Sequence, residues 1–180
     1  MKKAILALLT VLLAPAAFAE VRSAAPNGFT TVNEVLVDAS PAAAWAAALE
    51  VGKWWHSDHT ISGDARRMSI EAVTQGCFCE TLGDQAGVVH MVVTSVMPMT
   101  SLRLTGGLGP LGLMGVDGNM TWDFEAAGDG TRIRFTYAVG GYMDGGLEQM
   151  AGPVDYVLGE ALQRLAAYLE TGDPERTAVE

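Results

Sequence analysis

Most of the chemically reactive side chains of this chain lie in two short segments, Trp54–His59 and Gly76–Glu80. Two of the three histidines, His56 and His59, and both cysteines belong to these segments. Cysteine and histidine are common ligands of zinc and copper, and a thiolate beside a base is a nucleophile. If the fold brings the two segments together, they form a metal site, a redox site or one wall of a ligand pocket.

Cys77 and Cys79 are separated by a single residue, which leaves three states open to them. They are candidate metal ligands with His56 and His59, although structural zinc sites more often space their cysteines about two to four residues apart. They are candidates for a disulfide, which needs a bulge or a tightened backbone, because Cα atoms two residues apart on a regular strand are about 6.5 to 7 Å apart. As free thiols they offer one nucleophile–base pair, Cys79 with His90 or His59. We expect neither a metal ion nor a cofactor.

The catalytic alternative is a general acid/base pair made by Asp58 and His59, facing Asp155 or Glu160 across the mouth of a cavity. Such a pair suits a cyclase or hydratase that acts on an apolar substrate with a polar head. The ordinary structural role of Asp58 is to cap a turn, which aspartate does often. Catalysis therefore stays an alternative here and is not the main prediction.

The N-terminal residues predict export. Lys2 and Lys3 precede an apolar run over residues 4–13, and small residues end at Ala19, so we expect a signal peptide over residues 1–19 that is cut after Ala19. The apolar run is shorter than the roughly 20 residues that a membrane span requires. We therefore expect a periplasmic or secreted protein without a stable membrane anchor after cleavage.

The chain is acidic and poor in charge. Loss of Lys2 and Lys3 would change its formal charge from −10 to −12, which argues against nucleic acid and anionic membranes as partners. Only 18% of the residues are charged, whereas 49% are apolar. This composition provides more apolar surface than a minimal core requires, which favours a ligand that is itself apolar.

Hydrophobic periodicity predicts one domain over residues 29–172, with a flexible leader at 20–28 and a tail at 173–180. A β-branched stretch at 29–37 predicts a first strand, and a Ser-Pro cap predicts a helix at 42–51. An apolar stripe between Leu147 and Leu169 predicts a long closing helix. Six further strands are predicted at 68–73, 77–82, 88–97, 101–104, 118–126 and 131–139.

This order, β-α-β6-α, predicts an α+β helix-grip fold, in which a curved seven-stranded antiparallel sheet wraps around the long C-terminal helix. Nine methionines and 21 glycines allow space between sheet and helix. The uncharged, apolar loop Gly106–Gly115 is either a lip over the resulting pocket or a connection folded onto its own core. Trp54 and Trp55 are adjacent, so we expect one in the core and one at the cavity rim. The residues expected to contact the ligand are Trp54, Trp55, His56, His59, Cys79, His90, Leu111, Met114, Tyr142, Asp155, Leu158 and Leu162.

The first strand, the segment Asp38–Trp45 and the closing helix resemble the START-like or SRPBCC superfamily, which includes polyketide cyclases, lipid-transfer domains and the activator domain of the heat-shock ATPase. Within it the chain looks like a bacterial subgroup with the motifs WWxxDHTxSG and GCFCE. The resemblance implies the helix-grip fold and a hydrophobic cavity, and it transfers no catalytic residues. Members are mostly cytoplasmic, so an exported chain speaks against a heat-shock ATPase partner. The matching stretches are Trp54–Gly63, Gly76–Glu80, Leu102–Gly112, Gly130–Tyr142 and Val154–Gly172.

The sequence therefore predicts an exported protein that binds a small hydrophobic or amphipathic molecule between the sheet and the C-terminal helix. One alternative is a cyclase- or hydratase-like enzyme that uses Asp58 and His59. The other is a metal or thiol-redox protein centred on Cys77 and Cys79 with nearby histidines.

Overall fold

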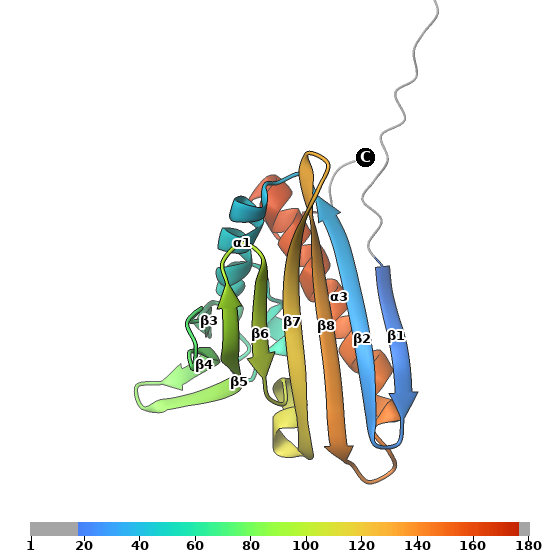
Figure 1. The fold of residues 1–180 in the computed structure, drawn as a ribbon. Helices are drawn as coiled ribbons and strands as arrows, with labels where there is room; N and C mark the ends of the chain where they lie inside the picture. The colour runs from blue at the N-terminus through green and yellow to red at the C-terminus, as the bar shows by residue number, and fades with distance from the viewer. Residues whose placement is uncertain (1–17, 177–180) are drawn as a thin grey trace, which may run out of the picture.

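A computed structural model describes residues 18–176, with side chains from residue 20 onward. Its centre is one curved antiparallel sheet of eight strands in the order β1-β2-β8-β7-β6-β5-β4-β3, and the long helix α3 lies along one face of that sheet (Figure 1). The α+β helix-grip fold is thereby confirmed, with one strand more than the sequence predicted. The strands are β1 (Phe18–Ala25), β2 (Gly28–Val37), β3 (Met68–Ile70), β4 (Cys77–Gly83), β5 (Ala86–Met97), β6 (Ser101–Thr105), β7 (Gly115–Ala127) and β8 (Gly130–Tyr142). The helices are α1 (Pro41–Leu49), α2 (Val51–Trp54) and α3 (Glu148–Thr171), with single 3-10 turns η1 (Ser57–His59), η2 (Ala65–Arg67) and η3 (Gly109–Leu113).

The additional strand is β1, where the prediction of a flexible leader at 20–28 was wrong. It pairs antiparallel with β2, for example Val21 with Thr31 and Ala24 with Phe29. Its side chains from Glu20 onward are exposed, so the strand lacks the alternation of apolar and polar residues that marks a half-buried strand. This edge strand is therefore held by its main-chain hydrogen bonds to β2, and such bonds leave no pattern in the amino-acid sequence. Most of the predicted signal peptide, residues 1–17, lies outside the described residues.

The core fills the space between the inner face of the sheet and α3. Alternate residues of β8, among them Phe135 and Tyr137, are fully buried there. The rings of Trp122 and Phe135 stack with their centroids 4.5 Å apart, and Trp54 packs against both. α3 contributes its predicted apolar stripe, which includes the buried Leu158, and the helix ends at Gly172 in the left-handed conformation that favours glycine.

The ends of three strands, β3, β7 and β8, differ from the predictions for local reasons. β3 ends at Ile70 instead of continuing to residue 73, because the chain turns so that the Val73 amide bonds the Glu71 carbonyl. A Cβ on Gly76 would clash with that carbonyl oxygen, so the turn requires glycine there. β7 and β8 extend further than predicted because glycine-rich segments continue their pairing as far as Gly115 with Tyr142. Within residues 18–176, no helix combines the length and apolar composition needed to cross a membrane.

Candidate functional site

A cavity of about 370 Å³ lies between α3, the loop before β7 and the segment that follows α2. Its walls are mainly apolar, and α3 lines one side with residues spaced three and four apart, such as Met150, Val154 and Val157. This spacing places them on one helix face beside Leu158. The remaining lining residues are Trp55, Asp58, His59, Thr60, Ile61, Met68, His90, Leu108, Gly109, Pro110, Leu111, Leu113, Tyr137, Pro153 and Leu158.

The apolar loop Gly106–Gly115 combines the two roles between which its sequence left a choice. Leu111 is buried in the protein core, whereas Leu113 is 92% exposed, and both line the cavity. The loop contains η3, which carries Pro110 in its first turn. The loop therefore covers part of the core and also forms one side of the cavity mouth.

The segment after α2 places one histidine at the cavity rim. His59 Nε2 lies 2.7 Å from Oε2 of Glu160 on α3, and the Trp55 indole donates to the His59 carbonyl. His56 lies beside His59, with ring centroids 5.5 Å apart, and its Nδ1 accepts from the Asp58 amide. Potential ligand atoms of His56, His59 and Glu160 lie within 4.8 Å of one another. Among the described residues, these three form the group that could hold a metal ion. Of the two carboxylates expected opposite His59, Glu160 contacts it, and Asp155 accepts a hydrogen bond from Asn33.

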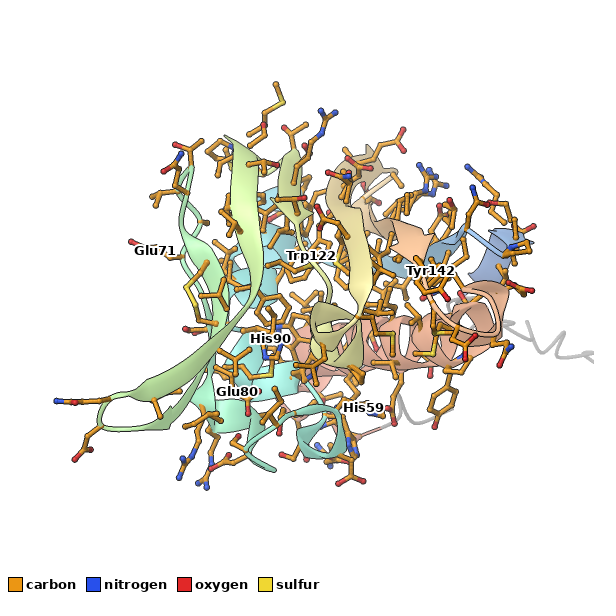
Figure 2. The ribbon with its side chains drawn as sticks, turned by 90° about the horizontal axis from the view of Figure 1, so that it is seen from below. His59, Glu71, Glu80, His90, Trp122 and Tyr142 are labelled. Carbon is orange, nitrogen blue, oxygen red and sulfur yellow. A yellow bond between two sulfur atoms is a disulfide. The ribbon has the colours of Figure 1, made fainter. Side chains whose placement is uncertain are left out.

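A second histidine–carboxylate pair is buried in the sheet. His90 on β5 and Glu80 on β4 are 5% and 1% exposed, and His90 Nε2 lies 3.0 Å from Glu80 Oε2 (Figure 2). Glu80 also accepts hydrogen bonds from the amides of Ile61 and Ser62. Burial alone would raise the pKa of Glu80, but the hydrogen bonds from Ser62, Ile61 and His90 outweigh it and hold that pKa below its ordinary value. The carboxylate is therefore ionised at neutral pH.

Cys77 and Cys79 form a disulfide, and their Cα atoms are 5.4 Å apart. The backbone is thus tighter than in a regular strand, as such a bridge requires. The candidate nucleophile Cys79 and the candidate Cys ligands of a metal are contradicted, because a disulfide sulfur is neither a thiolate nor an available ligand. Neither cysteine lines the cavity, and Phe78 and Glu80 point to the opposite, buried face of β4.

The structure separates the remaining predicted contact residues into two groups. Trp55, His59, His90, Leu111 and Leu158, together with the catalytic candidate Asp58, line the cavity. The others do not line the cavity: Trp54 and Leu162 lie in the core, and Asp155 is bonded to Asn33. Tyr142 is 74% exposed and lies far from Glu80 (Figure 2). His56, Cys79 and Met114 are also absent from the cavity lining.

Sequence reasoning missed Glu80 and the α3 residues Met150, Val154 and Val157. Signals for both were present in the chain. Glu80 lies two residues after Phe78, so on a strand both side chains point to the same, inward face. The α3 residues continue the apolar stripe of the helix at helical spacing.

The fold has been seen in several solved structures. The chain is 16% identical to CalU16 from Micromonospora echinospora, with a TM-score of 0.56, over 89% of this chain and 88% of that one. A protein from Mesorhizobium loti is 18% identical, with a TM-score of 0.59, over 80% of this chain and 98% of that one. The Aha1 dimer from Colwellia psychrerythraea is 18% identical, with a TM-score of 0.54, over 79% of this chain and 97% of that one. At these identities the likeness concerns the fold.

Among curated proteins, none matches the sequence significantly. A family model does: the one described as "Polyketide cyclase / dehydrase and lipid transport" matches residues 29–170, which span β2 to nearly the end of α3. The match includes every residue that lines the cavity. The chain therefore belongs to the polyketide cyclase / dehydrase and lipid transport family.

Proposed function

We propose that this protein is an exported binding protein for a small hydrophobic or amphipathic molecule, which it holds in the cavity between α3 and the sheet. The observation that carries the proposal is the cavity itself, about 370 Å³ in volume, with apolar walls and few polar groups. Sites for small molecules commonly have volumes of about 300–1,000 Å³ and this type of lining. Membership of a family that includes lipid transport supports the same conclusion.

The test of binding uses an apolar fluorescent probe, N-phenyl-1-naphthylamine, whose emission rises in an apolar site. Val157 lines the cavity from α3, so Val157→Trp would fill part of it. We expect at least a tenfold lower affinity for this variant. Gln163→Trp places the same side chain at an exposed position of α3 outside the cavity lining and should bind like the wild type. Wild-type affinity in a folded Val157→Trp variant would refute the proposal.

Native mass spectrometry of protein isolated from its own host adds an independent measurement. We expect a bound molecule that is released by organic extraction and that is absent from Val157→Trp. Export is tested on the same material. The N-terminal pattern predicts a mature chain that starts at Glu20 and is recovered from the periplasm or the medium. An intact chain that starts at Met1 and remains in the cytoplasm would contradict export.

The second candidate is a cyclase- or hydratase-like enzyme with His59 as general acid or base. The contact between His59 and Glu160 favours it, because a carboxylate bonded to one ring nitrogen orients an imidazole whose other nitrogen is free to exchange a proton. The molecule recovered from the native protein serves as substrate. If the protein is an enzyme, His59→Ala abolishes its conversion and leaves its binding nearly intact. An unchanged rate would rule this residue out.

A further inference from the structure

We infer that His90, oriented by Glu80, accepts a hydrogen bond from the bound molecule, so that the cavity selects apolar molecules that carry a hydroxyl or phenol O–H group. This inference rests on the proposed function and specifies the class of ligand.

The contact with Glu80 places a proton on His90 Nε2. Glu80 is ionised, so its oxygens only accept hydrogen bonds, and the Ile61 and Ser62 amides already donate to them. The contact of 3.0 Å between His90 Nε2 and Glu80 Oε2 therefore requires a hydrogen on Nε2. In the neutral ring this leaves Nδ1 as a lone-pair acceptor.

The other ring nitrogen, Nδ1, has no hydrogen-bond partner among the described residues. His90 lines the cavity although its side chain is only 3% exposed, and no hydrogen bond to its Nδ1 occurs within residues 20–176. Two other polar groups of the cavity wall already have partners: the Tyr137 hydroxyl bonds Gly106 and Leu108, and His59 Nε2 contacts Glu160. Nδ1 is thus an acceptor without a protein donor on a residue of the mainly apolar cavity wall, so a ligand O–H that reaches it gains a hydrogen bond.

A β-bulge lets this residue of β5 reach the cavity. In the β4–β5 ladder Phe78 pairs with Met91 and Cys79 pairs with Val89, so His90 is the extra residue of a bulge. Both His90 and Met91 are buried, which strict alternation along a strand would forbid. Bulges redirect side chains in this manner, and they are common beside functional sites.

Two neighbouring features fix this bulge. The Cys77–Cys79 disulfide tightens β4 opposite it, where the Cα atoms are 5.4 Å apart. On the other side the loop backbone approaches closely, since a Cβ on Gly106 would lie 2.7 Å from the His90 carbonyl oxygen. The position of the imidazole is therefore set by the backbone on both sides, as expected for a group that recognises a ligand.

The experiment compares 1-naphthol with 1-methoxynaphthalene, two ligands that differ by a methyl group on the oxygen, by calorimetry at pH 8. The ether lacks the donor and is the more apolar of the two, so apolar burial alone favours the ether. We expect the wild type to bind the naphthol about 5- to 10-fold more tightly, which is the worth of one hydrogen bond. His90→Phe should lose this preference and still bind the ether. Gln163→Phe, at the exposed position of α3 outside the cavity lining, should keep it.

A readout that does not depend on variants is the ¹⁵N NMR spectrum of the histidine rings. We expect the free protein to show the Nε2–H tautomer of His90, and 1-naphthol but not the ether to shift its Nδ1 resonance. Equal affinities for the two ligands, or an Nδ1–H tautomer, would overturn the inference. The proposed function would then still stand or fall on the probe experiment with Val157→Trp.

Discussion

The hydroxyl of Tyr137 on β8 donates a hydrogen bond of 2.8 Å to the carbonyl oxygen of Gly106. The hydroxyl oxygen of Tyr137 also accepts a hydrogen bond of 3.0 Å from the Leu108 amide, so one side chain holds both ends of a turn in the loop that borders the cavity. Burial raises the pKa of Tyr137 to about 12, which keeps the phenol protonated and able to donate at neutral pH. The sheet thereby fixes the position of an otherwise glycine-rich loop.

Removal of this hydroxyl in Tyr137→Phe should loosen the loop without emptying the core. Two partly buried backbone groups, the Gly106 carbonyl and the Leu108 amide, lose their partner, so we expect a loss of about 1–3 kcal/mol in the free energy of unfolding. Urea unfolding measures it. Hydrogen exchange adds a local measurement, because the Leu108 amide should exchange faster in the variant. The exchange rates of amides in the β2–β8 ladder should rise only as far as the loss in the free energy of global unfolding requires. Unchanged protection of Leu108 would show that the hydroxyl does not hold the loop.

The absence of a side chain at Gly118 is needed to seat the same tyrosine. A Cβ at this position would lie 2.5 Å from Cε2 of Tyr137, and the ring is held in place by its hydrogen bonds. We expect Gly118→Ala to destabilise the protein by about 1–3 kcal/mol through overpacking. Gly152→Ala is the matched control, because a Cβ there meets nothing within 4 Å and alanine favours the helix by about 1 kcal/mol. Thermal unfolding of both variants should shift in opposite directions.

The regular parts of this fold could be predicted from the sequence because each carries a periodic burial pattern. Buried residues largely alternate along β2 and β8 and recur at helical spacing along α3, and all three elements lie where the sequence predicted them. β1 could not be predicted, since an exposed edge strand is held by main-chain bonds that leave no side-chain pattern.

The candidate site was predicted in part for a similar reason. Trp55, His59 and His90 were identified by residue type, and all three line the cavity. The partner of His90 was not identified, because the pairing of Glu80 with it depends on a bulge between strands. Such a register shift is a tertiary feature, which one strand's own pattern does not encode.

The Cys77–Cys79 disulfide should contribute little to global stability and more to the shape of the bulge. It closes a very short loop, so the chain-entropy model assigns it only about 1–2 kcal/mol. We expect Cys77→Ser/Cys79→Ser to remain folded, with a modest loss in urea unfolding. The preference for 1-naphthol over 1-methoxynaphthalene should fall, because β4 can relax to a regular spacing opposite His90. A retained preference in this variant would show that the bulge is fixed without the disulfide.

The ionised Glu80 carboxylate should make stability depend on pH in a defined direction. Its pKa in the folded protein is below the ordinary value, so its contribution is complete above the unfolded pKa of about 4.3 and is lost as the pH falls through the folded pKa. Glu80→Gln keeps the shape but has no charge to strengthen the bonds from Ile61 and Ser62. We expect this variant to be about 1–3 kcal/mol less stable than the wild type at pH 7. In urea unfolding the two proteins should converge as the pH falls through the lowered pKa of Glu80, where the carboxylate becomes protonated. If the difference in the free energy of unfolding between the two proteins stays constant from pH 7 to pH 3, the charge of Glu80 does not stabilise the segment that contains Ile61 and Ser62. In that case only the shape of the side chain matters.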